Sequence, residues 1–219
     1  TNFIQDDITV SGGTLSNFNP ISSTVYTATL TPFGSGTSVV QITTVDVANG
    51  AFTDLAGNNN SAATQFKWTY NNTGPTMTIK ARSAVSNNLI VNGSTISTEF
   101  SPYLNLTFTS SRATTNFNVN DITVSGGTLS DFDGTGTTYT AKLTPTGSGN
   151  PNITQVTTIN IAEGTFTDSI GNSNTAATEF KWTYDTTQPG ISIASSTVNS
   201  GDRTRDTSIA LTFTSTKST

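Results

Sequence analysis

The chain contains no cysteine and no histidine. Without cysteine it has no disulfide, thiolate metal site or cysteine nucleophile, and without histidine it lacks the Ser-His-Asp arrangement and most catalytic zinc sites. Nine Lys and Arg stand against fourteen Asp and Glu, and the net charge of −5 argues against nucleic-acid binding. No apolar run approaches the ~20 residues of a membrane span. We therefore expect no membrane insertion of this segment.

The residues that are abundant indicate an all-β protein. Thr is the commonest residue, and Val, Ile, Phe and Tyr add to the strand formers. Asn-Gly, Gly-Gly and Asp-Gly pairs mark turns between these segments. Apolar residues alternate with Thr, as in Leu104, Leu106 and Phe108, and no stretch has the 3.6-residue period of an amphipathic helix. The period of two predicts sheets with one buried face and one face in water.

Most of the sequence occurs twice in the same order. Trp68 and Trp182 lie at equivalent places, 114 positions apart, within segments that repeat as 1–18 and 115–132, 24–32 and 137–145, and 50–70 and 164–184. A further segment, 103–117, returns in part as 208–219, where Phe108 and Phe213 are 105 positions apart. A repeat of this length predicts a tandem array of one domain type.

The two ends of the chain complete each other. The chain stops in TFTSTKST at Thr219, the equivalent segment continues with TNF, and Thr1 begins TNF. We therefore expect one period of a longer repeat, cut inside a domain. Residues 75–188 should form a complete sandwich. Residues 1–74 should form the later strands of another sandwich, whose opening strands come from a preceding copy of residues 189–219.

About seven short strands in each unit, with turns at regular spacing, predict tandem immunoglobulin-like β-sandwich domains. In each domain the large aromatic residues on alternating positions should fill the interior. The residues expected to dominate the two cores are Phe52, Trp68 and Phe108, with Phe166, Trp182 and Phe213.

The segments DITVSGGTLS, YTATLTP, GAFTDLAGN and WTYDTTQP resemble the bacterial Ig-like repeats of very large surface adhesins. The resemblance covers nearly the whole chain, and its segments occur in order and twice. It implies secreted domains in series that carry an adhesive or anchoring element away from a cell. It also implies calcium at domain junctions, because several related extender repeats bind calcium there.

Two loops rich in oxygen ligands are the first candidates for a site. Asp54 and Asn58 lie in one loop, and Asp168 and Asn172 hold the same places in its repeat. Ca²⁺ takes six to eight oxygen ligands, which carboxylates and amide carbonyls supply. The alternative is a turn in which Gly takes a positive φ and the Asp and Asn side chains bind local backbone N–H groups. Both interpretations stay open from the sequence.

Acidic residues near the predicted junctions are the second group. Asp185 begins the segment before Pro189, and Asn71 takes its place at the other junction, so the two joints are expected to differ. Acids of two domains that meet at a linker would hold an ion. The calcium hypothesis covers these residues: Asp7, Asp54, Asn58, Asp121, Asp168, Asn172, Asp185, Asp202 and Asp206.

The preferred function is a structural one, an extracellular or cell-surface stalk or filament built from domains stacked end to end. Its partners are then copies of itself, either in one continuous chain or as subunits that donate strands to one another. The alternative is a glycan- or protein-binding adhesin module. We expect no enzyme: adjacent Asp6 and Asp7 would point to opposite faces of a strand, and no other carboxylate pair suggests itself.

Overall fold

The computed structural model describes residues 2–36, 38–96 and 102–218. Within these ranges the regular structure consists of β-strands and two short 3-10 helices, η1 (Gln5–Asp7) and η2 (Val119–Asp121), without an α-helix. The prediction of an all-β fold is confirmed. The chain divides into two compact units: unit 1 of Thr1–Thr76, Ser111–Asn116 and Glu163–Thr175, and unit 2 of Met77–Ser110, Phe117–Ala162 and Ala176–Thr219.

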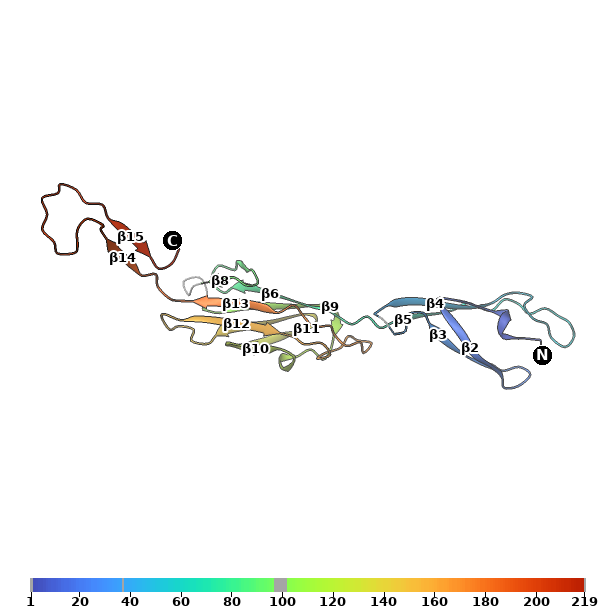
Figure 1. Ribbon diagram of the computed structural model, residues 1–219. Helices are drawn as coiled ribbons and strands as arrows, with labels where there is room; N and C mark the ends of the chain where they lie inside the picture. The colour runs from blue at the N-terminus through green and yellow to red at the C-terminus, as the bar shows by residue number, and fades with distance from the viewer. Residues whose placement is uncertain (1, 37, 97–101, 219) are drawn as a thin grey trace. The chain divides into compact units, whose positions relative to one another are not determined.

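Unit 2 contains a β-sandwich of two four-stranded sheets (Figure 1). The first sheet has the strand order β10 (Thr123–Ser125), β12 (Thr154–Asn160), β13 (Phe180–Asp185) and β8 (Thr95–Ile96). The second has the order β11 (Gly127–Pro145), β9 (Leu104–Thr114), β6 (Met77–Ser83) and β7 (Leu89–Ile90), and the end of β9 belongs to unit 1. The prediction of an Ig-like β-sandwich is confirmed.

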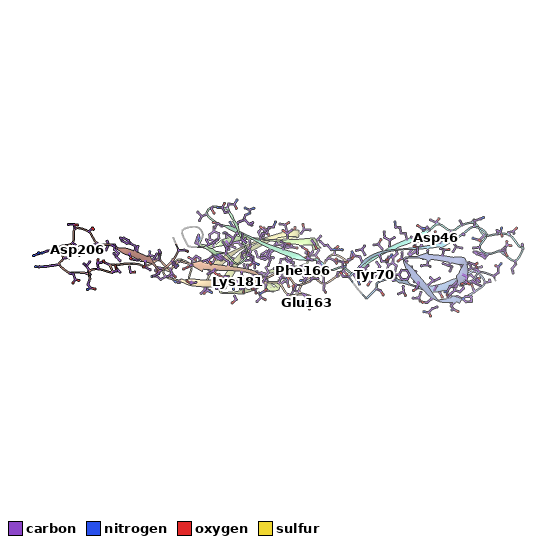
Figure 2. All side chains as sticks on the ribbon, turned by 45° about the horizontal axis from the view of Figure 1, so that its top comes forward. Asp46, Tyr70, Glu163, Phe166, Lys181 and Asp206 are labelled. Carbon is purple, nitrogen blue, oxygen red and sulfur yellow. The ribbon has the colours of Figure 1, made fainter. Side chains whose placement is uncertain are left out.

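The interior of this sandwich follows the period of two seen in the sequence. On β13, Phe180, Trp182 and Tyr184 are buried, whereas Lys181 between them is exposed (Figure 2). On β9 the buried residues alternate in the same way. The other large buried apolar side chains come from the remaining strands and their flanks: Met77, Ile90, Phe117, Ile122, Tyr139, Leu143, Ile159 and Ile161.

Unit 1 contains a three-stranded sheet and a hairpin. The sheet has the order β1 (Ile8–Ser11), β4 (Val40–Val47) and β5 (Phe66–Asn71), and the hairpin pairs β2 (Gly13–Pro20) with β3 (Tyr26–Pro32). In the sheet Thr43 lies opposite Trp68, and in unit 2 the equivalent Thr157 lies opposite Trp182. Equivalent segments therefore pair in the same register in both units.

A glycine pair turns the chain between β10 and β11. Gly126 has φ +71°, and a Cβ added there would stand against the carbonyl oxygen of Val156. Gly12, its equivalent before β2, has φ +76° and the same conflict with Ile42. Only glycine fits both the left-handed conformation and the close approach.

The last two strands form a separate hairpin in unit 2. β14 (Ile191–Ala194) pairs with β15 (Thr212–Ser215), and the long loop between them contains Asp206 (Figure 2). All four residues of β14 are exposed, as is most of β15. These strands carry the sequence that is equivalent to β6 and β9.

The prediction of two aromatic cores is confirmed for Phe108, Phe166 and Trp182, which are buried. Trp68 and Phe213 are exposed instead, so the prediction is wrong for them in this chain. Phe52 is only half-buried. The physical reason is that unit 1 has, among its described residues, no strand pair equivalent to β6 and β9, and the β14–β15 hairpin has no opposing sheet of its own.

Candidate functional site

Residues 185–190, which begin with the last residue of β13, are bound by the residues that follow β15. Lys217 Nζ donates hydrogen bonds to Asp185 Oδ2 at 2.7 Å and to the carbonyl oxygen of Thr187 at 2.6 Å. Gly190 N donates to Thr216 Oγ1 at 2.7 Å, and Thr216 N donates to the carbonyl oxygen of Gly190 at 2.9 Å. We call residues 185–190 the charged linker.

The hydrogen bond from Lys217 and the one from Thr187 N lower the pKa of Asp185 to about 2. Both donors favour the ionised carboxylate over its neutral form. Asp185 therefore stays charged, and the ion pair persists, over the whole physiological pH range.

Residues 71–76, the equivalent segment after β5, contain no acid, and we call them the neutral linker. Asn172 Nδ2 donates to the carbonyl oxygen of Asn71 at 3.3 Å, and Thr175 N donates to that of Pro75 at 3.1 Å. Thr76 N donates to Ser111 Oγ at 2.9 Å. This linker is thus held by hydrogen bonds between uncharged groups, whereas an ion pair holds the charged linker.

Asp168 lies at the centre of the loop that contacts the neutral linker. Its Oδ1 accepts from the backbone N of Ile170 and Asn172 at 3.1 and 2.9 Å, and Arg112 Nη1 lies 3.8 Å from Oδ2. Burial raises the pKa of Asp168, but the hydrogen bonds from Asn172 and Ile170 and the charge of Arg112 outweigh it, so the pKa is lowered. The carboxylate is therefore ionised although it is buried.

Asp54, the equivalent residue in the loop between β4 and β5, makes the same turn but is exposed. Its Oδ1 accepts from Ala56 N at 2.8 Å and Asn58 N at 2.9 Å, and Asn58 Nδ2 donates to Oδ2 at 2.9 Å. The side-chain bond from Asn58, followed by the backbone bonds, lowers the pKa of Asp54. Gly57 in this loop has φ +85°. These are the contacts that the turn interpretation predicts.

Asp7 and Asp121 end the two 3-10 helices rather than lying in strands. Asp121 Oδ2 accepts from Asn118 N at 2.8 Å, and Asp7 Oδ2 accepts from Ile4 N at 2.8 Å. The expectation that Asp6 and Asp7 lie in a strand is therefore wrong, because the side chain of Asp7 caps a helical turn instead of alternating across a sheet.

Asp202 and Asp206 lie in the loop between β14 and β15. Asp202 Oδ2 accepts from Asn199 N at 2.8 Å, and Asp206 Oδ2 accepts from Thr204 Oγ1 at 2.7 Å. In the part of the chain that the structure describes, no three Asp or Glu side chains form a group that could hold a metal ion. The calcium hypothesis stays a prediction that direct titration with Ca²⁺ must test.

A family comparison connects these repeats to known proteins. The model of the family described as "Bacterial Ig-like domain" matches residues 1–70 and again residues 71–184. The chain belongs to this family. Such domains usually occur in extracellular or surface proteins and are typically not enzymes. No curated protein and no solved structure matches the chain.

Two basic residues of this bacterial Ig-like chain were missed by sequence reasoning. Arg112 and Lys217 pair with Asp168 and Asp185, but each was passed over as part of a Thr-rich strand. The available signal was the internal repeat, because TFTSSRAT and TFTSTKST place a basic residue at the same position. A basic residue in both copies, near an acidic loop and an acidic linker, predicts an ion pair.

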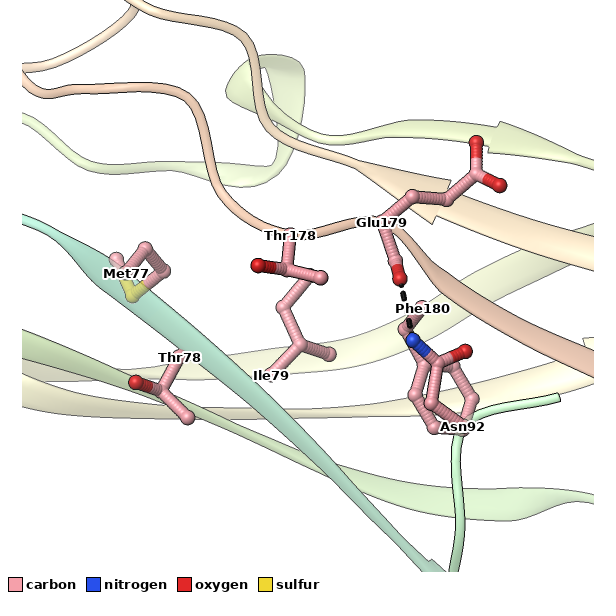
Figure 3. A pocket seen from close by; sticks show the side chains of 7 residues that line it. All are labelled: Met77, Thr78, Ile79, Asn92, Thr178, Glu179 and Phe180. Carbon is pink, nitrogen blue, oxygen red and sulfur yellow. Dashed lines mark hydrogen bonds between the residues drawn. The ribbon is translucent and has the colours of Figure 1, made fainter.

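A cavity of about 140 Å³ lies between β6 and the start of β13 (Figure 3). Asn92 closes one side, because its Nδ2 donates to the carbonyl oxygen of Glu179 at 2.7 Å. The carboxylate of Glu179 accepts from Asn160 Nδ2 at 2.7 Å. Ligand pockets usually measure about 300–1,000 Å³, so this cavity is too small to suggest one. No helix in the described part of the chain is long and apolar enough to cross a membrane.

Proposed function

We propose that the chain is part of an extracellular stalk or filament in which Ig-like domains follow one another and extend or link surfaces. The observation that carries the proposal is that both linkers are tied down by specific contacts. Lys217 holds the charged linker, and Asn172 and Ser111 hold the neutral one. A linker that only spans the distance between two domains is typically rich in Gly and Ser and behaves as a flexible coil. Linkers with fixed contacts suit a load-bearing rod.

A glycan- or protein-binding module is the alternative function. Such a module would present several aromatic side chains on neighbouring loops. Among the described residues, Phe33 is exposed in the loop after β3, whereas Phe66, Trp68 and Phe213, which are also exposed, lie on strands. One exposed loop aromatic in this part of the chain gives the alternative little support. A panel of immobilised glycans tests it, and specific retention of the chain would favour the adhesin.

Small-angle scattering after size exclusion tests the stalk. We expect the parent to scatter as an extended particle with restricted bending. Lys217→Met removes the ion pair of the charged linker and should broaden the distribution of interatomic distances. Lys142→Met is the matched control, because Lys142 also makes a 2.7 Å pair, with Asp131, but inside β11. A freely bending parent, or the same broadening in both variants, would refute the rigid rod.

Whether the copies form one chain or separate subunits must be tested on native material. We favour one continuous chain of repeats over separate strand-donating subunits, because the family model matches two successive segments of one chain, residues 1–70 and 71–184. Native material is boiled in detergent and separated on a gel. A very high mass is expected, and a ladder of species near one period would rule out the continuous chain.

A further inference from the structure

Unit 1 presents an apolar face that the equivalent strands of unit 2 bury. Trp68 is 38% exposed and Phe66 is 61% exposed, whereas Trp182 and Phe180 are 0% and 3% exposed. Tyr26, Leu30 and Val45 are also half-buried, whereas the equivalent Tyr139, Leu143 and Ile159 of unit 2 are buried. We define the acceptor face by five residues: Tyr26, Leu30, Val45, Phe66 and Trp68.

The β14–β15 hairpin presents the complementary surface. Ile191 and Phe213 are 70% and 60% exposed, whereas the equivalent Met77 and Phe108 are 5% and 0% exposed inside the complete sandwich. We define the donor hairpin by its four exposed apolar residues: Ile191, Ile193, Leu211 and Phe213. Its sequence is that of the strand pair that unit 1 lacks among its described residues.

The donor hairpin already has the geometry of the strand pair β6–β9. Ile193 lies opposite Phe213, and Ile79 lies opposite Phe108 at the equivalent position. The backbone bond that precedes each pair is also shared, because Thr216 N donates to Gly190 O and the equivalent Ser111 N donates to Thr76 O, both at 2.9 Å. Because a one-residue slip would turn every side chain to the other face, the shared register matters. The apolar residues of the donor hairpin therefore have the same cross-strand arrangement as the core residues of β6 and β9.

The charges are complementary as well. At the end of β9, Arg112 lies beside Asp168, which is buried. The residue equivalent to Arg112 on the donor side is Lys217, and the residue equivalent to Asp168 on the acceptor side is the exposed Asp54. A donor hairpin in the position of β6–β9 would bring Lys217 to Asp54. Lys217 would then lie between two carboxylates, those of Asp54 and Asp185.

We propose that the donor hairpin of one copy of this chain covers the acceptor face of a second copy and completes its sandwich. The proposal rests on the structural role proposed above and names the partner. Donor and acceptor are different surfaces of the repeat, so the contact is heterologous and successive copies follow one another head to tail. The complete sandwich of unit 2 supplies the template for the contact.

Sedimentation velocity over a range of concentrations tests the association with the full 219-residue chain. We expect species above the 22.9 kDa of one chain that grow with concentration. Phe213→Asp should abolish growth by placing a charge on the donor, and Phe66→Asp should abolish it on the acceptor. Val85→Asp is the matched control, since Val85 is 67% exposed in the turn between β6 and β7. A monomeric parent at all concentrations would overturn the proposal, as would equal behaviour of the three variants.

Mixing the two defective variants gives the sharper result. Phe213→Asp keeps an intact acceptor and Phe66→Asp keeps an intact donor, so a 1:1 mixture has one working interface. We expect a heterodimer of twice the chain mass and nothing larger. Nonspecific association of apolar surfaces would not stop at two chains, and a mixture that stays monomeric contradicts strand completion.

A permuted chain separates this inference from the stalk. In it residues 189–219 precede residues 1–188, so the donor hairpin and the acceptor face belong to one continuous domain. We expect a monomer in which Trp68 is as protected from acrylamide quenching as Trp182. A permuted chain with an accessible Trp68 would refute strand completion but leave the linker measurements of the stalk untouched. A particle that bends freely but has a protected Trp68 would refute the rigid stalk and support strand completion.

Discussion

The two tryptophans occupy equivalent places but should respond very differently to replacement by alanine. Trp182 is fully buried, and a buried Trp→Ala change costs about 3–5 kcal/mol from lost transfer energy and from the cavity left behind. Trp68 is 38% exposed in the parent. Of a burial of about 200 Å² for a tryptophan, roughly 80 Å² is then still in water, worth about 2 kcal/mol at ~25 cal/mol/Å². The free energy of unfolding should fall by at least that much less for Trp68→Ala.

The comparison needs a background without self-association, because a second copy that covers Trp68 would remove the difference. Both replacements are therefore made together with Phe213→Asp and unfolded with urea, followed by far-ultraviolet circular dichroism. The chain has two tryptophans, so the fluorescence of the one that remains reports on its own unit. Equal losses of stability would refute the assignment of Trp68 to an open face. In the permuted chain we expect the two losses to become equal.

A milder change at the same site separates packing from hydrogen bonding. The Nε1 of Trp182 is buried and has no hydrogen-bond partner among the described residues. An unsatisfied buried donor costs about 1–3 kcal/mol. Trp182→Phe removes this donor and retains a ring, so it should destabilise by less than half as much as Trp182→Ala. A loss as large as that of alanine would mean that the indole N–H has a partner, for example an ordered water.

Three further predictions concern the linkers, turns and ions. The pKa of Asp185 is about 2, whereas that of an unfolded Asp is about 3.9. The Lys217 pair should therefore stabilise the charged linker fully above pH ~4 and lose this effect as the pH falls towards 2. Amide exchange of the linker measures this pH dependence, and Asp185→Asn should remove it. Gly126→Ala should lower the free energy of unfolding by more than the ~1–2 kcal/mol of a left-handed residue, because its Cβ would meet the carbonyl oxygen of Val156. Gly171 has φ +91° and open space around it, so Gly171→Ala should lose only that amount. Thermal melting of both variants measures the difference. The calcium hypothesis predicts a lower melting temperature in chelator, and unchanged melting contradicts it.

The strands and the alternation of side chains along them could be predicted because they depend on local sequence. The alternation Phe180-Lys181-Trp182 specifies which face of β13 is buried, and the glycine pair ending in Gly127 specifies where β11 begins. The repeat adds an independent check, since the same pattern in β5 gives the same pairing. Such features are decided by neighbours along one strand and by turn chemistry, both of which are visible in the sequence.

Burial of the second set of strands could not be predicted in the same way. Trp68 and Trp182 lie in the same FKWTY sequence, yet one is exposed and the other is buried. The difference comes from the strand pair β6–β9, which is distant along the chain and has its counterpart in β14–β15. The partner of Arg112 could not be predicted from local sequence either, because its ion pair joins a strand end to a loop more than fifty positions away. The turn of Asp54, by contrast, was a stated alternative of the sequence and is the geometry observed.

The first position of each linker, Asp185 or Asn71, determines which kind of contact holds that linker. Asp185 draws Lys217 onto the charged linker at 2.7 Å, and Thr187 adds a second acceptor for the same ammonium group. At the neutral linker Asn71 offers no charge, and Arg112 lies beside the loop acid Asp168 instead. The basic residue thus pairs with the linker acid where the linker has one, and with the acid of the loop where it has none. We therefore expect added salt or acid to weaken the charged linker more than the neutral one. An ion pair binds the charged linker directly, whereas hydrogen bonds between uncharged groups hold the neutral linker and the Arg112–Asp168 pair lies only in the loop beside it.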